Sequence, residues 1–352
     1  MNNKEISIPS LLKIGDGKIF KIGKYLFDRK FMKVALFFSD GIESLVADKL
    51  YSGFKKFNIE TVHKDTISDI NIENAVHTAF KIPSDTNVLL GIGGGKALDY
   101  GKYCAHILKL PYISVPTSVS NDGFCSPNAS LLVAGKRKSV KSTIPYGVVA
   151  DLEIISNAPI SSLYSGLGDI IAKMTSLYDW KQAFLKGYED FNDFSGLISY
   201  NSLDIVYQNK DLKIQDHEFK YKMVNSLLLS GIAMEIAGSS RPASGSEHLI
   251  SHALDATLKK HKMHGLQVGI ATYLCSLLQN NRANEIKDFL LRTGFVNFAK
   301  KEPLNKKDFI TALKKAPSIK QNYYTVLSEK DSFEKAVEFL NTDEILKQLI
   351  IS

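Results

Sequence analysis

Histidines are concentrated in one short stretch of the sequence. Four of the eight lie within 17 residues, at His248, His252, His261 and His264. His248 and His252 are four residues apart, so on a helix they project from one face, with Asp255 one further turn along. Two neutral imidazoles and a carboxylate form a common catalytic metal set that leaves a coordination position open. The cluster therefore predicts a divalent metal site.

The carboxylate of such a site must come from another part of the sequence. Asp169, in the segment SGLGDIIAKM at a predicted helix start, is the candidate that we favour. An aspartate in that place could instead cap the helix, because its side chain accepts hydrogen bonds from free backbone N–H groups. Each histidine taken singly could also be a core or surface residue, so the metal interpretation depends on the cluster.

A glycine-rich segment, Gly91 to Lys96, follows the apolar run NVLL and precedes the helical pattern ALDYGKYCAHILKL. Glycines let the backbone approach an anion closely, and a helix start directs free N–H groups and the positive end of its dipole toward it. The segment is not a P-loop, because Leu90 and Ala97 occupy positions that need Gly and Ser or Thr, and it is not G-x-G-x-x-G. We expect a phosphate-binding loop, with a ligand-free tight turn as the alternative.

Polar side chains follow the next apolar strand. Thr117, Ser118, Ser120 and Asp122 lie in the segment VPTSVSNDG. In open α/β sheets, ligands bind beside the carboxyl ends of parallel strands. These residues are therefore candidates for ligand contacts, although a Ser/Thr-rich loop alone would mean little.

Two kinds of structure must position these segments. In residues 1–157, short runs of Val, Ile, Leu and Phe alternate with amphipathic stretches, which predicts a parallel sheet covered by helices on both faces. Seven of the ten prolines lie in residues 1–159, and strand signals stop after about Asn157. Because helix interiors exclude proline, residues 158–352 should be all-helical.

Composition excludes several classes of protein. The chain has 352 residues, 44% of them hydrophobic and 23% charged, which is typical of a two-domain globular protein. Cys104, Cys125 and Cys275 form no CxxC pair, no apolar run is long enough to span a membrane, and no secretory signal is evident. We therefore expect a cytoplasmic protein. The net charge of +7 comes from dispersed lysines, which argues against nucleic acid and fits anionic small molecules.

Six segments together resemble the sn-glycerol-1-phosphate dehydrogenase family, within the group of iron- or zinc-containing alcohol dehydrogenases and dehydroquinate synthases. They run in order through roughly residues 90–270: GIGGGKALDYGKYCA, LPYISVPTSVSNDGFCSPNASL, TIPYGVVADLEIISNAP, GLGDIIAKMTSLYDW, GSSRPASGSEHLISHALD and HGLQVG. The resemblance implies an N-terminal Rossmann-like, dinucleotide-binding α/β domain over 1–157 and a helical metal- and substrate-binding domain over 158–352.

The resemblance also implies which residues would bind the cofactor, NAD(H) or alternatively NADP(H). By position these are Gly93, Gly94, Gly95, Lys96, Ala97, Leu98 and Asp99 at the pyrophosphate and ribose, and Thr117, Ser118, Ser120 and Ser126 at the nicotinamide. Asp40 ends the predicted strand KVALFFSD, where a carboxylate could bind ribose hydroxyls and repel a 2′-phosphate. We therefore expect Asp40 to favour NAD(H).

For the metal, the resemblance implies Zn²⁺, or another dication such as Ni²⁺ or Fe²⁺, bound by Asp169, His248 and His264. Such a centre would polarise a ketone and stabilise an alkoxide during hydride transfer. His252 and Asp122 would be the catalytic residues, with His252 relaying protons. The substrate contacts would be Asp122, Asp169, His252 and Arg241. The family often has Glu where this chain has Leu266, which removes a possible carboxylate beside the metal ligands.

The function implied is a metal-dependent, NAD(P)-linked oxidoreductase that interconverts dihydroxyacetone phosphate and sn-glycerol-1-phosphate. Arg241, or alternatively the basic run Lys136, Arg137 and Lys138, would bind the phosphate. The alternatives are an NAD-linked glycerol dehydrogenase, a dehydroquinate-synthase-like lyase, and a non-catalytic protein that senses NAD or metal. We expect a polyol or polyol phosphate as the small-molecule partner, and a homo-oligomer, either dimer or octamer.

Overall fold

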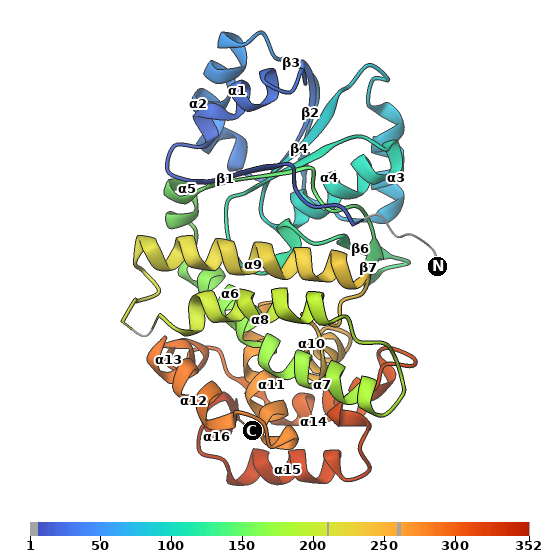
Figure 1. Ribbon diagram of the computed structural model, residues 1–352, viewed down its shortest axis with the longest axis vertical. Coiled ribbons are helices and arrows are strands. Elements are labelled where there is room, and N and C mark those ends of the chain that lie inside the picture. The colour runs from blue at the N-terminus through green and yellow to red at the C-terminus, as the bar shows by residue number, and fades with distance from the viewer. Residues whose placement is uncertain (1–5, 210, 259–261, 352) are drawn as a thin grey trace. The chain divides into compact units, whose positions relative to one another are not determined.

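The computed structural model describes residues 6–209, 211–258 and 262–351, so His261 of the histidine cluster lies outside the described residues. The chain divides into two units, Met1–Pro159 and Ile160–Ser352 (Figure 1). Each unit has its own secondary structure.

The first unit is built on a six-stranded sheet in which every described pairing is parallel. The strand order is β1-β8-β5-β4-β2-β3. The strands are β1 (Leu11–Gly15), β2 (Lys33–Ser39), β3 (Glu60–Ile67), β4 (Val88–Gly93), β5 (Tyr112–Pro116) and β8 (Gly147–Asp151). This arrangement confirms the predicted parallel-sheet α/β class.

Helices cover both faces of this sheet. Helices α1 (Ile22–Phe27), α2 (Ile42–Lys56) and α5 (Leu152–Ser156) contribute to one hydrophobic cluster, and α3 (Ile72–Lys81) and α4 (Gly95–Leu108) contribute to another. Figure 1 shows α1 and α2 on one side of the sheet and α3 and α4 on the other.

Strand β2 shows why polar and apolar residues do not alternate along the strands of this sheet. Val34, Leu36 and Phe38 belong to the cluster on the α2 side, whereas Ala35 and Phe37 belong to the cluster on the α4 side. Because both faces of the strand are buried, both sets of side chains are apolar.

A hairpin and two sheet strands of the first unit have weak sequence signals. Strands β6 (Asn128–Val133) and β7 (Lys136–Lys141) form an antiparallel pair, preceded by the 3₁₀ turn η2 (Asp122–Phe124). Strand β1 lies at the sheet edge and pairs in register with β8. Strand β7 is mostly charged, and β1 and β8 are short and lie far from each other along the chain, so local sequence patterns did not delimit these elements.

The second unit is helical, as predicted, apart from one small sheet. The strands β9 (Leu304–Asn305) and β10 (Ile350–Ile351) have two residues each and pair in parallel. Its described α-helices are α6 (Ile160–Ile171), α7 (Lys173–Leu185), α8 (Asp193–Tyr207), α9 (His217–Ala237), α10 (Ser246–Asp255), α11 (His264–Gln279), α12 (Ala283–Arg292), α13 (Phe295–Ala299), α14 (Lys306–Lys315), α15 (Ser332–Thr342) and α16 (Leu346–Leu349). Short 3₁₀ turns η3 (Ala316–Ser318) and η4 (Val326–Ser328) connect the last helices.

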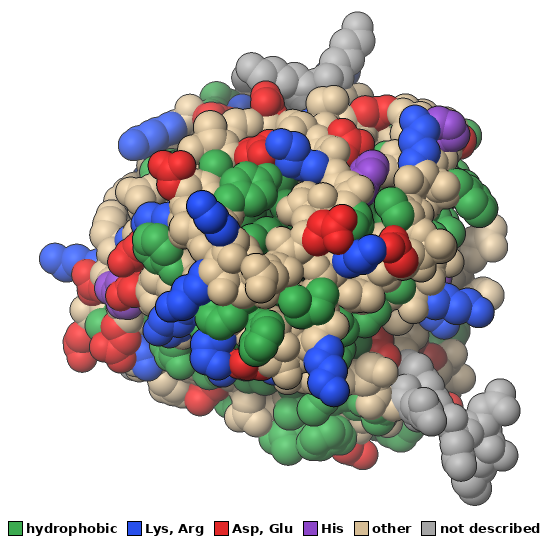
Figure 2. Space-filling view, turned by 90° about the horizontal axis from the view of Figure 1, so that it is seen from above, with side chains coloured by type: hydrophobic (Ala, Val, Ile, Leu, Met, Phe, Trp, Pro, Cys, Tyr) green, Lys and Arg blue, Asp and Glu red, His purple; other side chains and the backbone are tan. Residues whose placement is uncertain are grey.

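Within the described residues, no helix combines the length and apolarity that crossing a membrane would require. On the face shown in Figure 2, basic side chains are interspersed with acidic ones rather than gathered into one patch.

Candidate active site

The predicted phosphate loop lies at a topological switch point of the sheet. From β2 the chain crosses to β3 on one side, and from β4 it crosses to β5 on the other, so the carboxyl ends of β2 and β4 are neighbours. Gly93 has a φ of +149° and a Cβ atom there would overlap Ser39, which ends β2. The Gly94 N–H donates to Ser39 Oγ at 3.0 Å. Open α/β sheets bind ligands at such a point.

The start of α4 offers backbone donors rather than side chains. Its N-cap, Gly94, makes no side-chain cap hydrogen bond, and a Cβ on Gly95 would meet open space. Gly95 and Lys96 are exposed, whereas the side chains of Ala97 and Leu98 are buried. The N-terminus of this 14-residue helix can therefore receive an anion through its free N–H groups.

Asp99, predicted to contact the cofactor, is buried beneath this loop. Its carboxylate lies 3.3 Å from the Lys102 ammonium, which donates to the carbonyls of Gly123 (2.7 Å) and Ser126 (3.1 Å). Burial raises the pKa of Asp99, while the Lys102 charge opposes the shift. In the structure the pair ties α4 to the segment that follows β5.

Most of the remaining predicted cofactor residues follow the carboxyl ends of strands β2 and β5. The Thr117 N–H donates to the Gly93 carbonyl at 3.0 Å, and Ser126 Oγ donates to the Asn128 carbonyl. Asp40 is exposed at the end of β2. Ser118, Ser120 and Asp122 are partly exposed in the segment after β5.

Asp169, His248 and His264 come together in the second unit. One ligand atom from each lies within 4.8 Å of the other two, and His248 Nε2 is 3.3 Å from Asp169 Oδ1. Ligand atoms bound tetrahedrally to Zn²⁺ lie roughly 3.4 Å apart, so this donor set fits a dication after a small contraction. The His252 ring is nearby, with its centroid 5.8 Å from that of His264, but His252 is not part of the set.

A close crossing of α6 and α11 brings the ligands together. A Cβ on Gly168 would overlap the Gly265 carbonyl oxygen, and a Cβ on Gly265 would overlap the Ser165 carbonyl oxygen. Asp169 and His264 are their sequence neighbours. Asp169 lies in the last turn of α6, so its predicted place at a helix start is wrong. The glycines beside it permit a helix contact and do not mark a helix end.

Charges around Asp169 decide its ionisation. Burial by itself would raise the pKa of Asp169, but the Lys173 ammonium, 3.7 Å from Oδ2, and His248 together lower it. Burial likewise would lower the pKa of His248, yet the carboxylates of Asp169 and Glu247 raise it to about 9. The aspartate is thus ionised, as a metal ligand must be, and metal must compete with a proton for His248.

Hydrogen bonds orient both histidines of the set. His248 Nδ1 lies 2.8 Å from Glu247 Oε1, and His264 Nδ1 lies 3.1 Å from Ser251 Oγ. Ser251 donates to Gln267 Oε1, so it accepts from His264 Nδ1–H. In its neutral form each ring therefore carries its hydrogen on Nδ1 and leaves Nε2 available to a metal, a tautomer inferred from this network.

Sequence reasoning missed these surrounding residues, which are Lys173, Glu247, Ser251 and Gln267. Neighbours on a helix project about 100° apart, so the adjacency of Glu247 and His248 gave no reason to expect contact. The contact exists because the Glu247 side chain folds back over the start of α10.

Arg241, the predicted phosphate ligand, is fully buried in the second unit. Its guanidinium forms an ion pair with Glu189, donates to the Tyr324 carbonyl at 2.8 Å, and lies 3.4 Å from the centroid of the Tyr323 ring. The predicted hairpin basic residues Lys136, Arg137 and Lys138 are exposed on β7.

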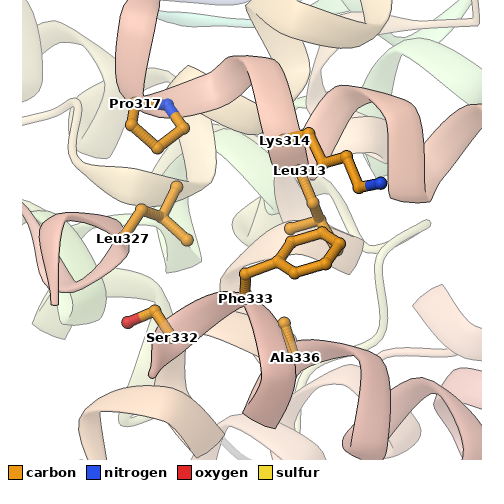
Figure 3. A pocket seen from close by; sticks show the side chains of 7 residues that line it. All are labelled: Leu313, Lys314, Pro317, Leu327, Ser332, Phe333 and Ala336. Carbon is orange, nitrogen blue, oxygen red and sulfur yellow. The ribbon is translucent and has the colours of Figure 1, made fainter. Parts of the chain in front are cut away.

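Two cavities lie elsewhere in the units. One, of about 200 Å³, is bordered by α14, η3, η4 and α15 (Figure 3). Its lining is mainly apolar, and Lys314 is its one ionisable residue. The other, of about 270 Å³, lies at the end of β3 and is lined by polar residues that include Asp65, Asp69 and His77. Neither shares a residue with the Asp–His–His set.

Known proteins resemble this chain in sequence and in fold. The model of the iron-containing alcohol dehydrogenase family matches residues 13–159. Solved structures agree on the fold: glycerol dehydrogenase from Schizosaccharomyces pombe superimposes with a TM-score of 0.75 at 18% identity, covering 99% of this chain and 91% of that one. Sulfoacetaldehyde reductase from Bifidobacterium kashiwanohense, solved with NAD⁺, gives 0.71 at 16%, covering 97% and 99%.

Sequence relatives narrow the class to one family. The chain is 36% identical over 312 residues to glycerol-1-phosphate dehydrogenase (NAD(P)⁺) from Methanosarcina mazei, covering 86% of each protein. It is 39% identical over 236 residues to the Pyrococcus furiosus protein of the same name, covering 66% of this chain and 68% of the relative. The chain belongs to the glycerol-1-phosphate dehydrogenase family.

Proposed function

We propose that this protein is a metal-dependent, NAD(P)-linked oxidoreductase that interconverts dihydroxyacetone phosphate and sn-glycerol-1-phosphate. The observation that carries the proposal is the Asp169, His248 and His264 cluster, in a chain 36% identical over 86% of its length to a protein named for that activity. We assign dinucleotide binding to residues 1–157 and metal and substrate binding to residues 158–352.

In this proposal Asp169, His248 and His264 hold Zn²⁺, or alternatively Ni²⁺ or Fe²⁺. The bound dication supplies a Lewis acid that polarises the substrate carbonyl. His252, partly exposed and 5.8 Å from His264 between ring centroids, exchanges a proton with solvent or positions substrate. Asp122 contacts substrate, and Arg241 binds its phosphate.

On the cofactor side, the backbone at the start of α4 binds the pyrophosphate of NAD(P), whose nicotinamide carries the hydride. The predicted residues Gly93 to Asp99 supply this loop, with only backbone groups offered by Ala97 and Leu98. Thr117, Ser118, Ser120 and Ser126 line the nicotinamide end. Asp40 binds the ribose hydroxyls.

The test is NADH oxidation by metal-loaded protein with dihydroxyacetone phosphate beside free dihydroxyacetone. We expect a preference for the phosphorylated substrate. A preference for free dihydroxyacetone would favour a glycerol dehydrogenase. Release of inorganic phosphate without net NADH consumption would favour a lyase, and binding of NADH without turnover of any substrate would favour a sensor.

We also propose a homo-oligomer, either dimer or octamer, in the cytoplasm, with no nucleic-acid partner. The three cysteines are buried as free thiols, which supports a reducing compartment. Sedimentation velocity of the full chain tests the assembly, and a monomer at micromolar concentration would contradict it.

A further inference from the structure

Glu247 is a carboxylate with no exposed surface at the start of α10. Its two oxygens accept hydrogen bonds from the helix start, from α7 and from one histidine of the metal set. Oε1 accepts from the Gly245 N–H at 2.6 Å and from His248 Nδ1 at 2.8 Å, and Oε2 accepts from Thr175 Oγ1 at 2.8 Å. The side chain is therefore fixed by α7 and by its own helix start, and it contacts the metal set through Nδ1 of His248.

This contact determines which nitrogen of His248 faces the site. An ionised carboxylate can only accept a hydrogen bond, so Nδ1 carries the hydrogen and the lone pair of the neutral ring is on Nε2. Nε2 is the atom that lies 3.3 Å from Asp169 Oδ1. The other histidine of the set has a weaker partner, because His264 Nδ1 contacts the neutral Ser251 hydroxyl.

The charge balance gives Glu247 a second effect. The fully buried Lys173 ammonium lies 3.7 Å from Asp169 and opposes a dication bound there. Glu247 adds a buried negative charge on the opposite side of His248 and makes the imidazole a stronger donor to a metal. Leu266 is buried at the position where the family resembled by the sequence often has Glu, so that position supplies no carboxylate beside the metal ligands.

We propose that Glu247 is the positioning residue of the metal centre: its hydrogen bond from His248 Nδ1 fixes the ring with Nε2 toward the metal and strengthens metal binding. The inference rests on the metal role in the proposed function. It adds the residue that supplies a carboxylate partner to one metal-ligating histidine.

A neighbouring carboxylate provides a matched control. Asp179, on α7, is also buried and accepts hydrogen bonds from the N–H groups of Ser246 (2.7 Å), at the start of α10, and of Val326 (2.8 Å), so it bonds neither metal-ligating histidine. Substitutions at Asp179 and Glu247 should both destabilise this helix start. Only a substitution at Glu247 should alter metal binding.

The experiment measures the Kd for Zn²⁺ of the metal-free full chain at pH 7.5, by competition with a chromophoric chelator, together with its melting temperature. We expect Glu247→Ala to weaken binding about 10- to 100-fold. Glu247→Gln keeps an acceptor oxygen without the charge, so its Kd for Zn²⁺ should lie between those of wild type and Glu247→Ala. Asp179→Asn should lower the melting temperature and leave the Kd within about threefold of wild type.

The outcomes separate this inference from the proposed function. If His248→Ala loses Zn²⁺ while Glu247→Ala and Glu247→Gln bind like wild type, the metal centre stands and the role of Glu247 is refuted. Equal weakening by Asp179→Asn and Glu247→Gln would show only a loosened helix start, and would also overturn the inference. Unchanged binding by His248→Ala would remove the metal centre and the positioning role together.

Discussion

Gly168 and Gly265 meet at the crossing of α6 and α11 so closely that a Cβ on Gly168 would overlap the carbonyl oxygen of Gly265. Asp169 follows the first glycine and His264 precedes the second. The separation of the two proposed metal ligands is therefore set by backbone contact between helices 100 residues apart, as the hydrogen bond from the Gly265 N–H to Ser165 Oγ also shows.

Gly168→Ala should disturb both stability and metal binding. The added methyl group would overlap the backbone carbonyl of Gly265, which cannot rotate away, so the two helices must separate. We expect a cost of about 3 kcal/mol in the free energy of unfolding, which corresponds to roughly 6–12 °C in melting temperature. Differential scanning calorimetry and Zn²⁺ titration measure the two effects. Gly95→Ala is the control for stability, since a Cβ there meets open space. An unchanged melting temperature in Gly168→Ala would contradict the tight crossing.

His252→Ala should retain metal and lose turnover. The His252 ring centroid lies 6.3 Å from that of His248 and the residue is outside the ligand set. Loss of a general acid or base costs about 10² to 10⁴ in rate. Metal content by elemental analysis and kcat at saturating NADH check this, with His264→Ala as the variant that should lose metal. Loss of metal from His252→Ala would show that the ligand set is wrong.

Asp40→Asn should shift the cofactor preference toward NADP(H). Asp40 is exposed at the end of β2, beside the switch point where Gly94 bonds Ser39. Its negative charge would repel a 2′-phosphate, whereas the amide is of equal size and neutral. The ratio of kcat/KM for NADPH and NADH should rise at least fivefold. An unchanged ratio would remove Asp40 from the cofactor site.

Asp179 should make the unfolding free energy depend on pH between about 4 and 6. Burial, followed by the charge of Glu247, raises the pKa of Asp179 from 3.8 to about 6. A carboxyl group with a raised pKa in the folded state binds its proton more tightly there, so its contribution to stability is present below pH 4 and is lost as pH rises through 6. The change is on the order of 3 kcal/mol.

Urea unfolding of the metal-free protein at several pH values tests this. The difference in unfolding free energy between wild type and Asp179→Asn should fall as pH rises from 4 to 6.5, because other titrating groups cancel in the difference. Metal-free samples are used because a bound metal would compete with the proton for His248 and add its own pH dependence. A difference that is constant with pH would mean that Asp179 titrates near its ordinary pKa.

Local sequence patterns predicted the sheet because burial on both faces leaves a local signature. The five buried residues from Val34 to Phe38 are all apolar, and the glycine segment begins within the last residues of the buried strand β4. The histidine spacing similarly placed His248 and His252 on one helix. What the sequence did not reveal depends on contacts between distant segments. Asp169 was predicted at a helix start but lies in the last turn of α6, where Gly168 contacts the distant Gly265, and Arg241 pairs with a carbonyl 83 residues away.

Arg241 can have either of two roles, binding the substrate phosphate or stabilising the fold, and the two roles predict different effects of substitution. Its guanidinium already has an anionic partner in Glu189, so a substrate phosphate would have to replace that carboxylate or share the guanidinium with it. Burial, and then the charge of Arg241, lower the pKa of the adjacent Lys320 to about 8. Lys320 is thus a second basic group beside Arg241 that would favour a phosphate.

If Arg241 binds the phosphate, Arg241→Ala should raise KM for dihydroxyacetone phosphate at least tenfold, since a charge-assisted hydrogen bond contributes about 1.5–3 kcal/mol and about 1.4 kcal/mol is a factor of ten. KM for free dihydroxyacetone should barely change. Glu189→Gln, which removes the competing charge and keeps the arginine, should lower KM for the phosphorylated substrate alone.

The structural alternative gives the opposite pattern. Breaking a buried ion pair by removing one partner costs about 3–5 kcal/mol, so Arg241→Ala could act only through the fold. In that case both variants would lower the melting temperature and change KM for the two substrates equally. Because Glu189 is partly exposed, Glu189→Gln should remain folded even where Arg241→Ala does not. An unchanged or higher KM for dihydroxyacetone phosphate in Glu189→Gln would therefore assign Arg241 to holding the Tyr324 segment and not to the substrate.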